Sequence, residues 1–239
     1  MTSDRVSAII PVFNGAAFLA DALESVRAQA VAPDEIVVVD DGSTDGSAEI
    51  ASRHPGVSVV AHDANRGLPA ARNTGLAAAV GDVIAFLDAD DLWVPEKTGL
   101  QRDRLRHDPD VDIVVGHTQR TRLVTRDDGT TAFEPWSEPE LALSLGAALV
   151  RRRVFDVIGD FDESLPFTND WDWFLRAREQ GVSIAIHADV VQHYRRHDAN
   201  MTEAVDDGNR YTLLMLRKSL QRRRERGGEA ESLPPLDAE

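Results

Sequence analysis

The sequence predicts an α/β fold in which a mostly parallel sheet is flanked by helices. Short β-branched runs alternate with helical patterns four times before residue 90, which is typical of parallel sheets with helices on both faces. Polar clusters follow the second and fourth runs, where ligands bind in such sheets. The 239 residues, 42% of them apolar, are enough for a sizeable core in one large domain or two small ones.

The first half of the chain divides into predicted strands and the helices between them. Apolar runs predict strands at 6–10, 35–39, 57–61 and 82–87. Apolar residues at helical spacing, or an alanine-rich composition, predict helices at 18–26, 44–50 and 67–79. Ser43 or Thr44 is the expected N-cap of the second of these helices.

The second half is less regular. Helices are predicted at 95–107, 152–158, 170–180 and 211–220. Strands are predicted at 111–116, 145–150, 182–186 and 190–194, with a hairpin over 120–133 around Asp127-Asp128-Gly129. The end of the chain, 227–239, is predicted to be disordered.

The chain is acidic, with 26 Lys and Arg residues against 41 Asp and Glu and a formal net charge of −15. This charge disfavours nucleic acid and anionic membranes as general partners, and a divalent cation is one means of neutralising the acid locally. The absence of cysteine excludes disulfides and thiolate metal sites. No apolar run reaches membrane-spanning length and no leader peptide is evident, so we expect a cytoplasmic protein. The oligomeric state stays open, with a homodimer among the alternatives.

A basic stretch at 217–226 ends the last predicted helix. Such a stretch can contact an anionic membrane or an acidic partner. We interpret it instead as a solvated helix whose charge is offset by Glu225, Glu229 and Glu231.

An acidic cluster, Asp88-Ala89-Asp90-Asp91, follows the fourth predicted strand. In an extended segment Asp88 and Asp90 point to the same side, and two close carboxylates repel unless they are protonated or bridged by a cation. Oxygen ligands suit Mg²⁺ or Mn²⁺, and Mg²⁺ usually binds through one or two carboxylates plus substrate phosphates. The competing interpretation is a solvated acidic turn, but the position at a strand end favours a ligand site.

Two further segments point to the same sheet edge. A carboxylate within 40–45 can accept hydrogen bonds from a nucleobase or a ribose, although this segment also has the composition of a helix cap. Arg72, about one turn into a predicted helix, can pair with a diphosphate or simply be a surface arginine.

Two late segments carry candidate chemistry. Asp170, flanked by the indoles of Trp171 and Trp173, is a candidate general base beside a sugar-binding surface. The alternative is that Asp170 lies at a helix N-terminus, where the helix dipole favours an acidic residue, and that Trp171 and Trp173 pack in the core. Within 193–197, His-Tyr-Arg-Arg-His, one histidine can bind a metal, although a lone histidine is more often structural.

Taken in order, these segments resemble the family 2 glycosyltransferases, which have the GT-A fold. The resemblance covers 6–202, most of the chain. The matching segments are 7–14, 35–45, 65–73, 86–91, 159–163 and 169–171. One motif alone would be weak evidence, but six in the family's order make the resemblance specific.

The resemblance implies an inverting transfer of a sugar from a nucleoside diphosphate sugar, usually a UDP-sugar, to an acceptor hydroxyl, with Mn²⁺ or Mg²⁺ as cofactor. It implies that Asp41 contacts the base and Asp88 the ribose or diphosphate, and that Asp90 binds the metal. It also implies that Asp170 is the general base and that His197 approaches the metal or the diphosphate. The implied nucleotide-sugar contacts are Pro11, Phe13, Asp41, Arg72, Asp88 and Ala89.

The sequence departs from the family pattern at Asn169, where the family usually has Glu before the base aspartate. The base remains, but its electrostatic surroundings change, so a non-catalytic sugar-nucleotide-binding module stays as the alternative. Trp136, Trp171 and Trp173 are candidates for the acceptor side, while the acceptor itself stays unidentified. The expected organisation is a GT-A domain over 1–205, with a nucleotide-sugar-binding half (1–116) and an acceptor and catalytic half (117–205), followed by a C-terminal helix and tail (206–239).

Overall fold

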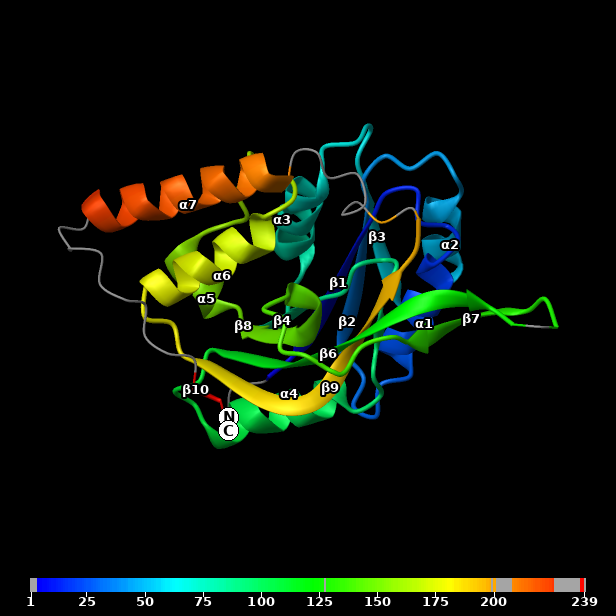
Figure 1. Cartoon of the computed structure of the whole chain (residues 1–239), viewed down its shortest axis with the longest axis horizontal. Helices are drawn as coiled ribbons and strands as arrows, with labels where there is room; N and C mark the ends of the chain where they lie inside the picture. The colour runs from blue at the N-terminus through cyan, green and yellow to red at the C-terminus, as the bar shows by residue number, and fades with distance from the viewer. Residues whose placement is uncertain (1–3, 127, 199, 201–207, 226–236, 239) are drawn as a thin grey trace.

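The computed structural model describes residues 4–126, 128–198, 200, 208–225 and 237–238. Within these residues the strands form one mixed sheet with helices on both faces (Figure 1). The strand order is β10-β9-β6-β8-β4-β1-β2-β3, with β5 paired to β9 and β7 paired to β6. The predicted α/β architecture is confirmed.

Four parallel strands form the first half of the sheet, in the order β4-β1-β2-β3. They are β1 (Val6–Val12), β2 (Glu35–Asp40), β3 (Val57–Ala61) and β4 (Val83–Phe86), close to the predicted ranges. The inner strands are buried on both faces, which is why their sequences are continuously apolar rather than alternating.

A proline is tolerated in β1 because β4 ends alongside it. The last residue of β4, Phe86, lies opposite Ile9, whereas Pro11 pairs with Val39 of β2. Beyond Phe86 the paired ladder on the β4 side stops, so the missing N–H of Pro11 costs no ladder hydrogen bond there. The chain leaving β4 is therefore free to turn across the carboxyl end of the sheet.

The helices of the first half are α1 (Leu19–Arg27), α2 (Ser47–Arg53), α3 (Leu68–Ala78) and α4 (Lys97–His107). The prediction that Ser43 or Thr44 caps α2 is wrong, because α2 begins later, after Gly46 at φ 91°. Ser43 Oγ instead accepts a hydrogen bond from the N–H of Asn14 at 2.9 Å, and the N–H of Thr44 donates to Asn14 Oδ1 at 2.9 Å. These residues join the loops that follow β1 and β2.

The second half continues the sheet with longer strands. The predicted hairpin is formed by β6 (Ile113–Thr125) and β7 (Thr131–Pro135). The strand predicted at 145–150 begins late, because a 3₁₀ turn, η1 (Leu145–Ala147), precedes β8 (Ala148–Arg151). At this turn a Cβ on Gly146 would come within 2.5 Å of the Gln192 side chain, so the close approach requires glycine.

The two strands predicted at 182–186 and 190–194 are one strand, β9 (Ile184–Arg196). Its register against β6 shifts on either side of His117, and β9 continues through this irregularity. The polar residues between the two apolar runs are therefore bulge residues rather than a loop. The two-residue strands β5 (Leu92–Trp93) and β10 (Asp237–Ala238) pair with β9.

Three helices belong to the second half. α5 (Arg153–Ile158) ends at Gly159 with φ 78°, as predicted, and α6 (Asn169–Glu179) also lies close to its prediction. α7 (Gly208–Glu225) extends beyond its predicted range at both ends and packs against α6 (Figure 1).

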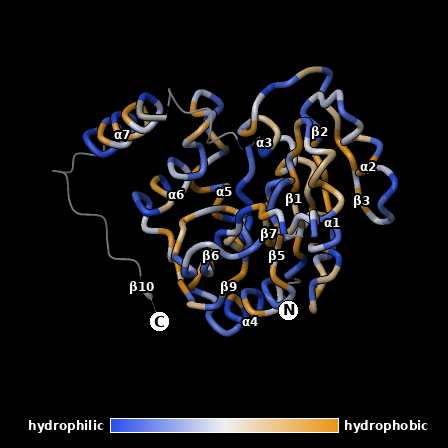
Figure 2. The backbone as a smooth tube through the Cα atoms, turned by 45° about the vertical axis from the view of Figure 1, so that its right-hand side comes forward, coloured by the Kyte–Doolittle hydropathy of each residue, from blue (hydrophilic) through white to orange (hydrophobic). Residues whose placement is uncertain are grey.

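The two faces of the sheet carry separate apolar cores. Ala8 and Ile10 of β1 contribute to a core shared with α1, whereas Ile9 belongs to a core shared with α3, α5 and α6. This division follows from the alternation of side chains along a strand. Figure 2 shows hydrophobic residues along the strands and mixed hydrophilic and hydrophobic residues on α6 and α7.

The predicted halves share this one sheet, since the boundary between 116 and 117 falls inside β6. Their functional division stays a prediction, as does the separation of 206–239 from the domain. Residues 227–236 and 239, for which disorder is predicted, lie outside the described residues, while Asp237 and Ala238 pair with β9.

Candidate active site

Polar side chains gather where β1, β2 and β4 end, at the carboxyl edge of the parallel strands. Hydrogen bonds connect this region to more distant segments. Arg72 of α3 bonds Asp88 and Asn169, and Asn200, beyond the end of β9, bonds Asp90. The location is the one predicted from strand order.

The acidic segment 88–91 is a turn rather than the extended segment that we expect from sequence. The N–H of Asp91 donates to the carbonyl of Asp88 at 3.0 Å, which closes the turn. Asp88 and Asp90 are nevertheless close enough that the charge of Asp88 contributes to raising the pKa of Asp90. The predicted proximity of these two carboxylates is therefore present, through a different backbone conformation.

Asp90 lies beside His197, the histidine predicted to approach the metal. His197 Nε2 is 3.3 Å from Asp90 Oδ2, and Asn200 Nδ2 donates to the same oxygen at 3.1 Å. The imidazole is mostly buried and stacks on the ring of Phe18 at a centroid distance of 4.1 Å. Burial and the neighbouring Asp88 raise the pKa of Asp90, as expected for carboxylates that share a partly buried site.

Asp91, for which the sequence implies no role, is almost fully buried and faces β9. It accepts hydrogen bonds from Gln192 Nε2 at 2.6 Å and from the N–H of Arg195 at 2.9 Å. Burial, with the charges of Asp90 and Asp88, raises the pKa of Asp91 well above the usual range. The residue ties the acidic turn to β9 and so fixes the position of Asp90.

Arg72 connects the acidic turn to the start of α6. Its side chain is 3% exposed and donates to Asp88 Oδ1 at 2.9 Å and to Asn169 Oδ1 at 2.6 Å. The Asn169 side chain also donates to the carbonyl of Pro166 at 3.1 Å. The alternative of a surface arginine is thus excluded, because Arg72 is a buried link between two site segments.

Asp170, the predicted general base, is half-buried at the start of α6, next to Asn169. Its Oδ1 accepts a hydrogen bond from the N–H of Trp171 at 2.9 Å. Burial raises the pKa of Asp170. The charge of Arg72 lowers this pKa and the charge of Asp88 raises it, and the net effect is an increase. A carboxylate with a raised pKa is suited to accept a proton near neutral pH.

Asp41 faces inward, towards the loop that precedes α3. Its carboxylate accepts hydrogen bonds from His62 Nδ1 at 2.6 Å and from the N–H groups of Arg66 and Gly67 at 2.9 and 2.8 Å. The side chain is almost fully buried. Asp41 therefore holds the 65–67 loop, and its contact with a nucleobase stays a prediction.

The remaining residues of the predicted donor site line the same edge. Phe13, just beyond β1, is 49% exposed, while Pro11 is buried in the sheet and Ala89 is nearly buried beneath the acidic turn. Phe13 is thus the one of these three with a large face open to a ligand.

The structure separates the three candidate tryptophans. Trp173 is wholly buried and packs against Phe155 and Phe161 at centroid distances of 4.9 and 5.9 Å. Its prediction as an acceptor-side residue is wrong, because the position lies on the core face of α6. Trp171, 56% exposed, and Trp136, 40% exposed beneath the Arg196 guanidinium, remain open to solvent.

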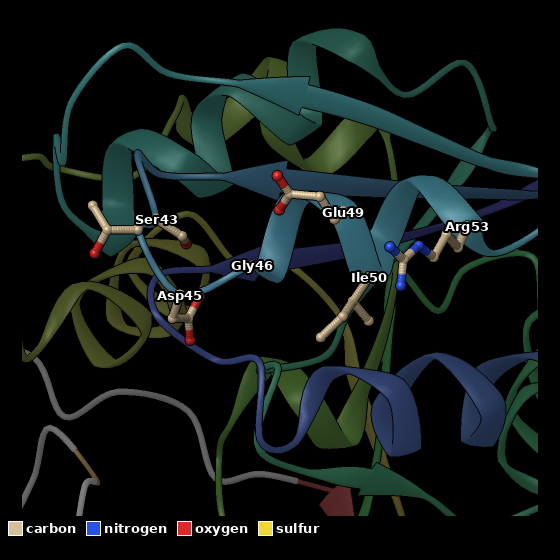
Figure 3. A pocket seen from close by; sticks show the side chains of 7 residues that line it. Ser43, Asp45, Gly46, Glu49, Ile50 and Arg53 are labelled. Carbon is tan, nitrogen blue, oxygen red and sulfur yellow. The ribbon is translucent and has the colours of Figure 1, made fainter.

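A pocket of about 600 Å³ lies beside the loop after β2 (Figure 3). Its lining includes Asp45, Glu49 and Arg53 from the loop and α2. None of the predicted donor residues lines it, so it is separate from the acidic turn.

Residues 7–161 match the family model described as glycosyl transferase family 2. The chain belongs to family 2 of the glycosyltransferases. It is 32% identical over 217 residues to an uncharacterized glycosyltransferase of Rickettsia typhi, covering 84% of this chain and 66% of that protein. It is also 31% identical to glycosyltransferase AglE of Haloferax volcanii, covering 78% of this chain and 65% of that protein. This glycosyltransferase therefore spans slightly less than two thirds of the length of these relatives.

Solved structures identify the fold of this glycosyltransferase as GT-A, as predicted. The mannosyltransferase PcManGT from Pyrobaculum calidifontis, in complex with GDP-Man and Mn²⁺, superimposes with a TM-score of 0.71, at 21% identity, over 97% of this chain and 66% of that chain. S. aureus TarS 1–349 in complex with UDP-GlcNAc gives a TM-score of 0.69, at 21% identity, over 88% of this chain and 65% of that chain.

Two polar residues of this candidate site carry no motif signal of their own in the sequence. Gln192 holds Asp91, and Asn200 holds both Asp90 and the N–H of His197. Their only signal is proximity along the chain to the 193–197 segment. Among the described residues, no group of three or more metal-ligating side chains comes together, and no helix is long and apolar enough to cross a membrane.

Proposed function

We propose that this chain transfers a sugar from a nucleoside diphosphate sugar, a UDP-sugar in the first instance, to an acceptor hydroxyl with inversion at the anomeric carbon. The observation that carries the proposal is the linkage of Asp88, Arg72, Asn169 and Asp170. Arg72 bonds both Asp88 and Asn169, so it links the acidic turn to the residue that precedes the candidate base.

The donor side of the proposal rests on the acidic turn, the exposed ring of Phe13 and the family to which the chain belongs. The two solved neighbours are complexes with UDP-GlcNAc and with GDP-Man, so both uridine and guanosine donors are worth testing. We place Asp88 towards the ribose or diphosphate and Asp41 towards the base, with Arg72 balancing the charge of the leaving diphosphate.

The residues present fit a divalent cation held by Asp90 and His197. A carboxylate oxygen and an imidazole nitrogen lie 3.3 Å apart, and burial together with the charge of nearby Asp88 raises the pKa of Asp90. The carboxylate oxygens of this site suit Mn²⁺ or Mg²⁺. A bound cation would stabilise the negative charge that develops on the diphosphate leaving group.

The proton transfer is assigned to Asp170. Its carboxylate would take the proton of the acceptor hydroxyl as that oxygen bonds to the anomeric carbon and the bond to the diphosphate breaks. One displacement inverts the anomeric centre, so no covalent nucleophile is needed. The raised pKa of Asp170 supports this role.

A donor panel tests the function directly. The full chain would be incubated with UDP-, GDP- and TDP-sugars and Mn²⁺, and the released nucleoside diphosphate measured. We expect release from a UDP-sugar that stops with EDTA and returns with added Mn²⁺. Donor binding without release from any member would favour the non-catalytic sugar-nucleotide-binding module, and EDTA-resistant release would contradict the metal assignment.

A further inference from the structure

A groove of about 530 Å³ lies between α6, α7 and the 140–144 segment. Most of its wall is apolar, including the side chains of Leu141, Leu143, Trp171, Leu175, Met215 and Leu216. The volume and the mostly apolar lining are typical of small-molecule sites.

On α6 the groove begins at Trp171, the residue after the proposed base, and Asp170 itself does not line it. Trp171, Phe174, Leu175 and Arg178 line it, and their spacing of three, four and seven residues places them along one face of α6. At a rise of 1.5 Å per residue this row is about 10 Å long. It begins one residue after Asp170 and leads away from it, so a molecule whose hydroxyl reaches Asp170 can extend along this row.

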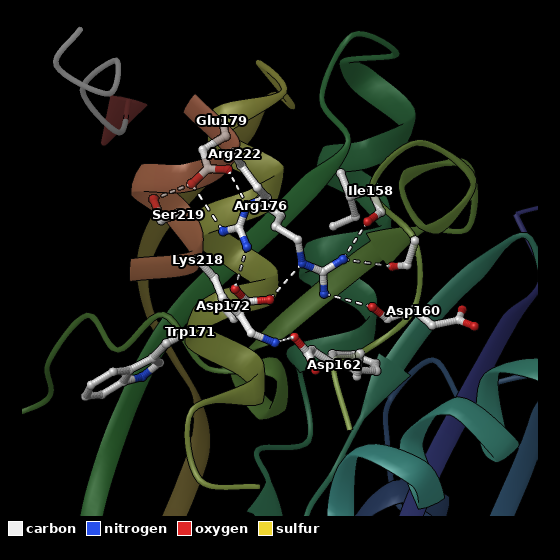
Figure 4. Close-up of polar contacts among 12 residues, drawn as sticks. Ile158, Asp160, Asp162, Trp171, Asp172, Arg176, Glu179, Lys218, Ser219 and Arg222 are labelled. Atoms are coloured by element: carbon white, nitrogen blue, oxygen red, sulfur yellow. Dashed lines mark hydrogen bonds and ion pairs between the residues drawn. The ribbon is translucent and has the colours of Figure 1, made fainter. Parts of the chain in front are cut away.

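Two pairs of polar groups lie at the groove wall. Arg120 Nε bonds Glu140 Oε1 at 2.5 Å, and the Ser144 hydroxyl donates to Gln192 Oε1 at 3.1 Å. An uncharged apolar group can enter the groove without breaking these two pairs. A charged group would lose its water and would have to break one of the pairs to gain a partner from them. Figure 4 shows the Trp171 ring pointing away from the ion-pair network that joins α6 to α7.

The apolar surface continues from the groove onto the outer face of α7. Leu216 lines the groove, and Leu213 and Leu220, three and four residues away, share its side of the helix. The three leucines are 46, 67 and 42% exposed. An apolar path that is longer than the groove matches an extended hydrocarbon chain better than a compact ring.

We propose that the groove binds the hydrocarbon chain of an amphiphilic acceptor, whose hydroxyl then lies at Asp170. This inference rests on the proposed function for the role of Asp170, and it names the substrate class: an alcohol or glycoside with an uncharged apolar chain. The exposed leucines of α7 receive the part of the chain that exceeds the groove.

The test begins with binding, independently of turnover. Decyl β-D-glucopyranoside, kept below its micellar concentration, would be titrated into the full chain by calorimetry, with methyl β-D-glucopyranoside as the short-chain comparison. We expect the decyl compound to bind and the methyl compound to show no measurable binding. Equal binding of both, or of neither, would overturn the inference.

Exposed leucines provide matched variants that should fold. Leu216→Arg and Leu141→Arg change the groove wall, while Leu123→Arg changes an equally exposed leucine of β6 that does not line it. We expect a loss of decyl glucoside affinity of at least tenfold in the first two and no change in the third. An unchanged affinity in both groove variants, or an equal loss in the control, would exclude the groove.

Donor turnover and oligomeric state separate this inference from its alternatives. Failure of every donor to release nucleoside diphosphate would remove the proposed function, while selective decyl glucoside binding would still support the groove. Normal donor turnover with no chain-dependent binding would remove the inference alone. A wild-type dimer that Leu216→Arg converts to a monomer, without any decyl glucoside binding, would show that a second copy occupies the surface and would contradict the proposal.

Discussion

Asn169 determines the charge balance around Arg72. An amide oxygen accepts the Arg72 hydrogen bond without neutralising the guanidinium, so within this cluster the charge of Arg72 is balanced by Asp88 alone. The same charge opposes the effect of burial on the pKa of Asp170. Asn169 thus adds no negative charge beside the proposed base, where the family usually has Glu.

Replacing Asn169 by Asp should make the proposed base titrate at higher pH. A carboxylate at 169 would offset Arg72 and repel the charged form of Asp170, which raises the pKa of Asp170 further. Because the base must be deprotonated, activity is lost as pH falls through this pKa. The acid limb of the kcat/KM profile should therefore move to higher pH in Asn169→Asp.

The neutral variant Asn169→Gln serves as the control and should leave the position of the acid limb unchanged. An acid limb that stays in place in Asn169→Asp, or moves to lower pH, would exclude Asp170 as the group that sets it.

At the scale of elements, α7 is held to α6 by buried ion pairs rather than by apolar contacts alone. Arg222 donates to Glu179 Oε2 at 2.8 Å and to Asp172 Oδ1 at 3.1 Å, and Arg176 bonds the other oxygen of Asp172 at 2.8 Å (Figure 4). Asp172 is fully buried. The expected solvated basic helix is thus wrong for Arg222, whose partners among the described residues are Glu179 and Asp172 of α6.

Removing Arg222 should destabilise the protein strongly. Arg222→Met would remove the guanidinium that bonds the buried carboxylates of Glu179 and Asp172, at an expected cost of about 3 kcal/mol in the free energy of unfolding. Urea denaturation followed by circular dichroism measures this change.

Arg224→Met, two residues further on, is the matched control. Arg224 is exposed and makes no ion pair with any residue that the structure describes, so we expect a change below about 0.5 kcal/mol. Equal stability losses in the two variants would contradict the assigned anchoring role of Arg222.

For the molecule as a whole, sequence patterns predicted most of the parallel half and less of the rest. The strand ends at Asp40 and Phe86 were predictable because continuous apolar runs stop there. The single long β9 was not, because a bulge keeps polar residues inside a strand. Periodicity alone does not specify that Asp90 lies beside His197, or that Trp173 lies in the core. Both positions depend on pairing between segments that are distant in the sequence.

The fold also contains a buried lysine that should make the stability of the whole molecule depend on pH. Lys97, 1% exposed, donates to Gln101 Oε1 at 2.7 Å and to the carbonyl of Ala148 at 2.9 Å. Burial lowers the pKa of Lys97 to about 7. Above this pH the folded state releases a proton that the unfolded state keeps up to about pH 10, so the free energy of unfolding rises with pH.

We expect the contribution of Lys97 to increase the free energy of unfolding by about 2 kcal/mol between pH 7 and pH 9. Lys97→Met should abolish this increase, since no buried ammonium remains to be deprotonated. Lys218→Met, which removes the half-buried partner of Asp162, should retain this increase. Urea titrations at both pH values measure the effect, and an unchanged increase in Lys97→Met would assign it to other groups.

The central claim, that Asp170 removes the acceptor proton, is tested most directly by Asp170→Asn in paired assays of donor binding and transfer. The substitution keeps the side-chain shape but removes the basic oxygen. The donor should still bind with near wild-type affinity in calorimetry, while steady-state transfer, measured as nucleoside diphosphate release with acceptor present, should fall by about 10²- to 10⁴-fold. Undiminished transfer in this variant would contradict the account.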